Sequence, residues 1–203
     1  HKKQSGGAGQ FGEVYLRVEP LTRGEGFQFV DEVKGGAIPF NFIPAVEKGV
    51  REVLTQGFIA GYPMQDIKVT VYDGKSHPVD SKEVAFVAAG RKAMLDALAK
   101  ASPTLLEPIA KLTITAPTVT LGDIAGDLAS RRGQVLNTVA TSSTSMEILA
   151  TVPLAEMDGY AARLNAMTQG AAVFTFEFYA YQPAPMQKQQ ELAAKYQRKD
   201  EDD

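Results

Sequence analysis

Hydrophobic positions along the first hundred residues alternate between two periods. A repeat of two, as in Val14, Leu16 and Val18, is typical of a strand with one buried face. A repeat of three and four, as in Val46, Val50 and Val53, is typical of a helix with one buried stripe. The predicted strands are 12–19, 27–33 and 67–72, and the predicted helices are 43–56, ended by Gly57, and 80–101. This half of the chain is therefore expected to form a mixed α+β domain.

The second half follows a different order of elements. Pro103 and Pro108 bracket a short segment that we interpret as a stiff connection between domains. Beyond it, the predicted strands are 110–115, 134–139, 146–152 and 171–181, and the predicted helices are 121–132, stopped by Gly133, and 154–170. The order βαββαβ is that of the ferredoxin-like fold. The predicted fold class is α+β with two domains, and a polar, partly helical tail that frays is expected from Pro183 onward.

Three aromatic residues, Phe174, Phe176 and Phe178, lie on one face of the last predicted strand. Such a row stacks on bases in some RNA-binding sheets. The alternation and the acidic neighbour Glu177 favour packing in the core instead.

The composition argues against several kinds of site and does not by itself identify a function. The chain is 44% hydrophobic and 22% charged, with a net charge of -3. It contains no cysteine and two histidines, which argues against disulfides, thiolate sites and histidine-based metal sites. No apolar run approaches the roughly 20 residues of a membrane helix, so no membrane partner is expected. The first residue is His1, within a polar run, which we interpret as a cut from a longer polypeptide.

The glycine-rich start is the first candidate binding segment. It runs Lys2-Lys3-Gln4-Ser5-Gly6-Gly7-Ala8-Gly9-Gln10-Phe11-Gly12 and carries two lysines and no acid. Glycines expose backbone N–H groups, and lysine and glutamine side chains bind phosphates and base edges. No Gly-Lys-Ser/Thr follows and a strand comes next, so this is not a Walker A loop. A flexible loop ahead of a strand remains the alternative.

A second candidate segment joins the strand at 67–72 to the following helix. His77 lies in a turn after Lys75, where an exposed imidazole can donate to a phosphate or a 2′-hydroxyl group. Asp80, with Glu83 three residues later, has the spacing of a helix N-cap. The alternatives are a solvated turn histidine and an acid–base pair of His77 and Asp80, for which no nucleophile or cofactor motif is present.

Arg131 and Arg132 lie at the predicted end of the helix over 121–132. Arginines at this position interact favourably with the negative end of the helix dipole. Contact with phosphate is the alternative.

Several of these segments, taken in order, resemble elongation factor G. The start of the chain from Lys3 to Gly12 resembles the first tip loop of its domain IV, and 76–81 resembles the second. The stretches 34–39, 43–46 and 60–63 resemble segments between them. The stretch 105–109 resembles the passage into domain V, and 122–134 and 152–160 resemble the two helices of that domain.

The resemblance implies domain boundaries and folds. It implies a domain IV-like part over 1–103, similar to ribosomal protein S5 domain 2, and a domain V-like ferredoxin fold over 104–182. A charged tail follows over 183–203. The strand that precedes the first tip loop in the family is absent here, so the strand over 12–19 is expected to leave one edge of its sheet unpaired.

The resemblance also implies a function. The chain is expected to be the C-terminal part of a translational GTPase that moves tRNA and mRNA through the ribosome. Its partners are then rRNA, tRNA and mRNA, and it is expected to be cytoplasmic and monomeric. GTP and Mg²⁺ are expected in domains outside this chain, with no cofactor, catalytic residue or metal site in it. The residues expected to contact RNA or the ribosome are Lys2, Lys3, Gln4, Ser5, Gly6, Gly7, Gly9, Gln10, Lys75, His77, Asp80, Arg131 and Arg132.

Two positions depart from the family pattern. Ala8 occupies a place that is often arginine, and Pro78 follows His77 where aspartate is common. These departures leave open a divergent paralogue that acts in ribosome recycling, tRNA-site clearance or another ribosomal role.

Overall fold

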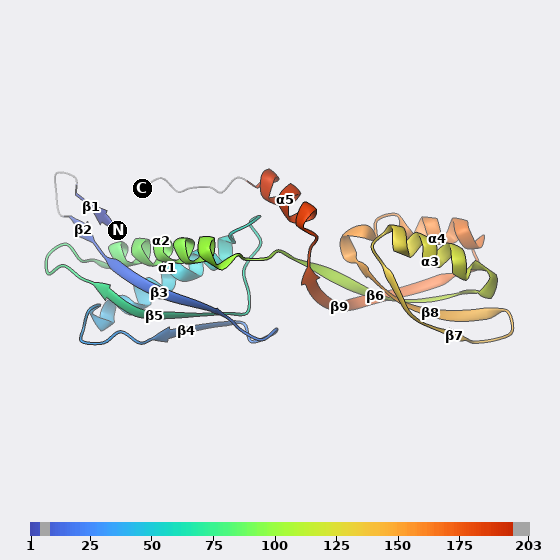
Figure 1. The fold of residues 1–203 in the computed structure, drawn as a ribbon, viewed down its shortest axis with the longest axis horizontal. Helices are drawn as coiled ribbons and strands as arrows, with labels where there is room; N and C mark the ends of the chain where they lie inside the picture. Colours follow the sequence, from blue (N-terminus) through green and yellow to red (C-terminus); the bar gives the residue numbers. More distant parts are fainter. Residues whose placement is uncertain (5–8, 197–203) are drawn as a thin grey trace. The chain divides into compact units, whose positions relative to one another are not determined.

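The chain forms two compact α+β units (Figure 1). The computed structural model describes residues 1–4 and 9–196. The first unit is His1–Thr104 together with the segment from Met186, and the second is Leu105–Pro185. The sequence placed the tail beyond Pro183 apart from both domains, whereas the structure groups its helix with the first unit.

Three strands form the main sheet of the first unit, in the order β3-β5-β4. The strands are β3 (Glu13–Pro20), β4 (Phe27–Asp31) and β5 (Ile67–Lys75). β5 pairs with β3 antiparallel and with β4 parallel. Within the described residues β3 has only this one neighbour, which confirms the unpaired edge expected for it.

Two helices pack against this sheet and against each other, α1 (Ile43–Gln56) and α2 (Glu83–Ala101). They approach closely because both carry a glycine at the contact. A side chain at Gly49 would meet the backbone of Val87, and one at Gly90 would meet the backbone of Val46. The elements of this unit match the predicted ones, except that β5 is longer, β4 is shorter and α2 begins three residues later than expected.

A short hairpin of β1 (Lys2–Lys3) and β2 (Gln10–Phe11) precedes the main sheet and was not predicted. At the other end of the chain, α5 (Met186–Lys195) confirms that the tail is partly helical. The ring of Tyr196, directly after it, lies against Gly61, and its hydroxyl donates to the carbonyl of Gln56 at 3.4 Å. These contacts explain why the helix belongs to the first unit.

The second unit has the predicted order βαββαβ. Its strands are β6 (Leu106–Pro117), β7 (Gln134–Ala140), β8 (Ser145–Pro153) and β9 (Val173–Pro183), and its helices are α3 (Leu121–Ser130) and α4 (Tyr160–Thr168). The four strands are antiparallel in the order β7-β8-β6-β9. Both helices lie on one face of this sheet (Figure 1). This arrangement confirms the ferredoxin-like fold.

The core of the second unit corrects the prediction for the aromatic row of β9. Phe174, Phe176 and Phe178 pair with core residues of β6 and share their face, as expected. Only Phe174 packs into the core, edge-on against Tyr160. Phe176 and Phe178 remain 55% and 62% exposed. β9 is an edge strand, and the buried residues come from β6, β8 and the helices, so the outer end of the row lies beyond them.

Two helix boundaries in this unit also differ from the prediction. α3 ends at Ser130, and Arg132 adopts a left-handed φ of 60° where Gly133 was expected to stop the helix. The Gly133 N–H still donates to the carbonyl of Leu128 at 2.7 Å. The helix expected from residue 154 is a 3-10 turn over Leu154–Glu156, and α4 begins only at Tyr160.

Candidate functional site

The two candidate loops of the first unit meet. The first is the β1–β2 hairpin, and the second is the turn between β5 and α2 (Figure 1). The backbone N–H of Phe11 donates to the carbonyl of Asp80 at 2.9 Å. The hydroxyl of Ser81 donates to the carbonyl of Phe11, also at 2.9 Å. The prediction that the glycine-rich start and the turn with His77 share one place on the surface is confirmed.

Gly9 lets the first loop lie directly on the second. It is buried, and a Cβ at this position would come within 2.8 Å of the Asp80 carboxylate. Any larger residue would have to displace the Asp80 side chain. Glycine is therefore needed here for close approach, in addition to any contact its backbone makes with a partner.

His77 is held by its own turn. Its Nδ1 accepts the backbone N–H groups of Val79 at 3.3 Å and of Asp80 at 3.1 Å. The ring also lies edge-on to Phe11, with centroids 6.3 Å apart. A neutral imidazole has one donor and one acceptor nitrogen, so acceptance at Nδ1 places the proton on Nε2. Within the described residues Nε2 has no hydrogen-bond partner, and the side chain is 51% exposed. His77 thus offers one N–H donor to a partner.

Asp80 does not cap the following helix, which corrects the prediction. α2 begins at Glu83 with Lys82 at the N-cap position, and no side chain caps it. The carboxylate of Asp80 lies instead against Gly9, with one oxygen 3.5 Å from the His77 Nδ1. Asp80 has the sequence spacing of a helix cap, but its side chain takes part in the contact between the two loops instead.

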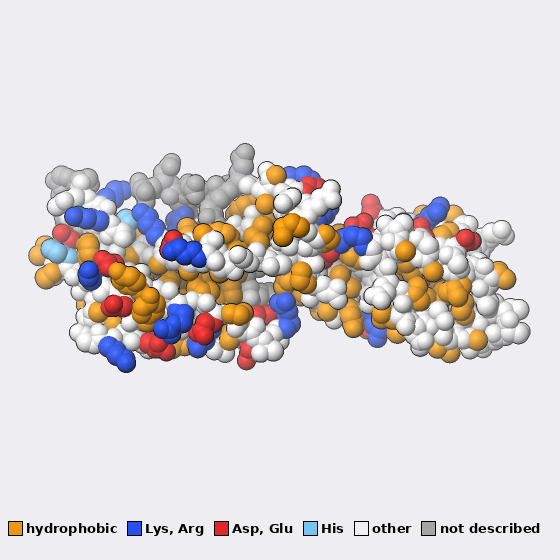
Figure 2. Space-filling model, in the orientation of Figure 1, with side chains coloured by type: hydrophobic (Ala, Val, Ile, Leu, Met, Phe, Trp, Pro, Cys, Tyr) orange, Lys and Arg blue, Asp and Glu red, His pale blue; other side chains and the backbone are white. Residues whose placement is uncertain are grey.

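The remaining tip residues are mostly exposed. Lys2, Lys3 and Gln4 are open to solvent, and Lys75 pairs only loosely with Glu13, at 3.8 Å. Figure 2 shows the blue of basic side chains and the pale blue of histidine at the end of this unit that carries β1 and β2. Within the predicted set, Ser5, Gly6 and Gly7 lie outside the described residues. The local surface is basic and rich in hydrogen-bond donors, as a phosphate-contacting surface requires.

Gln10 differs from its neighbours because its side chain is already engaged. Its Oε1 lies 3.0 Å from the His1 Nε2. The His1 carbonyl also accepts the Gly12 N–H at 3.0 Å. The predicted contact of Gln10 with RNA would have to replace or share this hydrogen bond.

Arg131 belongs to the second unit and is engaged within it. Its guanidinium donates to the Asp127 carboxylate at 3.0 Å and to the carbonyls of Glu156 and Asp158 at 2.6 and 3.0 Å. It also lies over the ring of Tyr160. These contacts tie the end of α3 to the segment before α4, and they give Arg131 a structural role.

Arg132 is paired with two carboxylates. Its guanidinium donates two hydrogen bonds to the Glu107 carboxylate, one to each oxygen, at 2.6 and 3.0 Å. It donates two more to Oε1 of Glu156, at 2.9 and 3.1 Å. These hydrogen bonds, first those to Glu107, raise the pKa of the guanidinium further above its usual value. Contact of either arginine with RNA remains a prediction.

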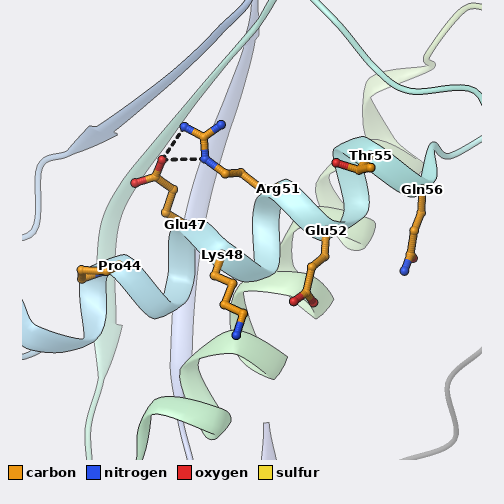
Figure 3. A pocket seen from close by; sticks show the side chains of 7 residues that line it. All are labelled: Pro44, Glu47, Lys48, Arg51, Glu52, Thr55 and Gln56. Atoms are coloured by element: carbon orange, nitrogen blue, oxygen red, sulfur yellow. Dashed lines mark hydrogen bonds and ion pairs between the residues drawn. The ribbon is translucent and has the colours of Figure 1, made fainter.

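The structure gives no support to an acid–base pair of His77 and Asp80. Nδ1 is occupied by two amides, so it is not available as a base. A hollow of about 520 Å³ lies elsewhere, along the exposed side of α1 (Figure 3). Its lining residues are Pro44, Glu47, Lys48, Arg51, Glu52, Thr55 and Gln56, and Glu47 and Arg51 form an ion pair across one helical turn. Neither tip loop contributes to it.

Ser81 was not among the predicted site residues, although it hydrogen-bonds to both loops. A serine ahead of a helix is common and carries no sign of a partner seventy residues away. Only the position of Phe11 in the fold identifies its role. The hydrogen bond between Ser81 and Phe11 could not be predicted from the sequence.

Comparisons with known proteins agree over almost the whole chain. Residues 1–102 match the family model described as elongation factor G, domain IV, and residues 104–192 match that described as elongation factor G C-terminus. Two proteins called elongation factor G, from Dehalococcoides mccartyi strains BAV1 and CBDB1, are each 51% identical over 183 residues. That alignment covers 90% of this chain and 26% of each relative. A crystal structure of a Thermus thermophilus protein matches with a TM-score of 0.78 and 38% identity, over 95% of this chain and 29% of that one.

Among the described residues, no helix combines the length and the apolar character that a bilayer crossing demands.

Proposed function

Because this chain belongs to the elongation factor G family, we propose that its two tip loops contact tRNA, mRNA and rRNA in the decoding region of the ribosome and so promote translocation. The chain spans about a quarter of the relatives it matches, at 26% of their length. The proposed parent protein is a cytoplasmic translational GTPase, and this chain is its ribosome-engaging C-terminal part.

One observation carries the proposal: the two loops meet and turn hydrogen-bond donors toward solvent. The Nε2–H of His77 and the side chains of Lys2, Lys3, Gln4 and Lys75 are exposed. Phosphate oxygens, 2′-hydroxyl groups and base edges accept such donors. Local positive charge of this kind suits RNA although the whole chain is acidic.

The mechanism we propose is placement. The loops are braced by their mutual hydrogen bonds, so they enter the RNA site with a set geometry and without a large ordering cost. When the braced tip occupies the space next to the paired tRNA and mRNA, they cannot return to that space. The tip therefore favours the state in which tRNA and mRNA have moved forward. In this mechanism the residues of the chain bind RNA and occupy space beside it, and they make or break no covalent bond.

GTP and Mg²⁺ are assigned to the missing part of the parent protein. The only Gly-Lys-Ser sequence is 74–76, and it does not fit a phosphate-binding loop. The glycine required five residues before Gly74 is Val69, which is buried in the core. Gly74 and Lys75 belong to β5, and a turn, not a helix, follows Ser76. The stretch 74–76 is therefore not a phosphate-binding loop, which supports assigning the nucleotide to other domains of the parent protein.

The test replaces His77 by alanine in the full-length protein. We expect the rate of translocation to fall by about tenfold, as for one lost oriented hydrogen bond at a positioned site, while ribosome-stimulated GTP hydrolysis remains largely intact. The matched control is Val84→Ala, an exposed position in the first turn of α2. An equal loss of translocation and hydrolysis in His77→Ala would contradict the placement role.

Pro78 favours a second candidate, a divergent paralogue with another ribosomal task such as recycling. Proline fixes the backbone of the turn directly after His77, where the family commonly has aspartate. The second loop is thus less acidic than in the family pattern. A translocation assay beside a ribosome-recycling assay on the same full-length protein separates the two, because the second candidate predicts recycling without translocation.

A further inference from the structure

The hydroxyl of Ser81 lies between the two tip loops and is hydrogen-bonded to both. Its Oγ accepts the backbone N–H of His77 at 2.8 Å. The same hydroxyl donates to the carbonyl of Phe11 at 2.9 Å. A hydroxyl has one donor hydrogen and two acceptor lone pairs, so a single serine satisfies both partners at once.

Two further contacts make this junction a closed network. The Phe11 N–H donates to the Asp80 carbonyl at 2.9 Å, and the Ser81 N–H donates to the His77 carbonyl at 3.1 Å. Gly9 lies against the Asp80 carboxylate with no room for a side chain. The first loop is therefore fixed to the same turn that fixes the imidazole.

The network determines which nitrogen of His77 faces outward. The turn directs the N–H groups of Val79 and Asp80 at Nδ1. Ser81 holds the backbone N–H of His77 at the start of that turn. When the turn is closed, the ring has its acceptor nitrogen inside and its donor nitrogen outside. When the turn opens, the ring is free to present either nitrogen.

We propose that Ser81 is a positioning residue for the tip: its hydroxyl fixes the first loop on the second and so presents the Nε2–H of His77 to an acceptor oxygen of RNA. The effect on the ribosome rests on the proposed function. The network itself is a property of this chain and is measured without a ribosome.

The first experiment compares three variants of the chain by NMR. In Ser81→Ala we expect the His77 amide to exchange with solvent at least about fivefold faster, because one hydrogen bond is lost, and the ring nitrogens to show both neutral tautomers. Ser81→Thr keeps the hydroxyl and should restore slow exchange and a single Nε2–H tautomer. Ser76→Ala, an exposed serine of the same loop, should leave both unchanged.

Amides of the buried strand β5 report whether each variant is folded. With those amides protected, unchanged His77 exchange in Ser81→Ala would overturn the proposal. So would a Ser81→Thr variant that behaves like Ser81→Ala, because the hydroxyl would then not be the group responsible.

The second experiment is a double-mutant cycle in the full-length protein, with translocation as the measured rate. Ser81→Ala should slow translocation severalfold in the presence of His77, and it should have no further effect when His77 is already alanine. Additive losses would show that Ser81 does not act through His77 and would overturn the proposal. If His77→Ala itself leaves translocation unchanged, the proposed function fails, while the NMR result still decides the role of Ser81 in the loop network.

Discussion

The contact between α1 and α2 makes a sharp prediction about glycine. Gly49 is buried at this contact, and a Cβ added there would lie 2.1 Å from the carbonyl oxygen of Val87. An ordinary contact is about 3.4 Å, so the two helix backbones would have to separate by about 1.3 Å. The obstacle is backbone and not the end of a flexible side chain, so a change of rotamer cannot relieve it.

The magnitude follows from two opposing effects. Overpacking of this kind costs about 3 kcal/mol, at the upper end of the usual range, because the separated helices also lose contacts around Val46 and Val50. Alanine is favoured over glycine inside a helix by about 1 kcal/mol. We therefore expect Gly49→Ala to lower the free energy of unfolding of the first unit by about 2 kcal/mol.

The matched control is Gly126→Ala in α3, where an added Cβ meets nothing within 4 Å. Here the helix preference acts alone, and the second unit should gain about 0.5–1 kcal/mol. The assay is native-state hydrogen exchange read by mass spectrometry, which reports on peptides of each unit separately. The loss of about 2 kcal/mol corresponds to a factor of about 30. The slowest-exchanging amides of the first unit should therefore exchange about 30-fold faster in Gly49→Ala. If Gly49→Ala is as stable as the parent chain, the described helix contact is wrong.

Three other substitutions test individual contacts. Arg132→Ala leaves the largely buried Glu107 carboxylate without its partner and should destabilise the second unit by about 1–3 kcal/mol in urea unfolding; a loss near zero would mean that the pairing is not structural. The hydrogen bond from the Gly26 N–H is the main cause that lowers the pKa of the Asp66 carboxyl in the folded protein. The ionised carboxylate therefore stabilises the fold above the unfolded pKa of about 3.9. This stabilisation is lost as the pH falls through the lower, folded pKa. Asp66→Asn should therefore flatten the pH dependence of unfolding below about pH 4, and an unchanged slope would argue against this ionised contact. Burial, with the nearby Asp127 charge second, raises the pKa of Tyr160 to about 12, and its hydroxyl has no hydrogen-bond partner among the described residues. Tyr160→Phe should consequently be neutral or stabilising by up to about 1 kcal/mol in thermal unfolding, and a clear loss of stability would reveal a partner for that hydroxyl.

The sequence by itself determined most of the elements and their order, though not the β1–β2 hairpin. Periods of two and of three to four residues located the strands and helices because each element buries one face, and that requirement is local. The order βαββαβ was enough to predict the ferredoxin-like unit, and the glycine-rich start and the turn with His77 were enough to predict the candidate site. The family pattern extended both predictions to the ribosome.

The tertiary structure decided how residues far apart in the chain use one another. Asp80 has the spacing of a helix cap, but its carboxylate lies against Gly9. Phe178 has the alternation of a core residue, but it lies on an edge strand beyond the buried core. Ser81 bonds to Phe11 across seventy residues of sequence. Local patterns report which face of an element is buried, whereas the partner of a side chain depends on which other element arrives beside it, and the fold alone sets that.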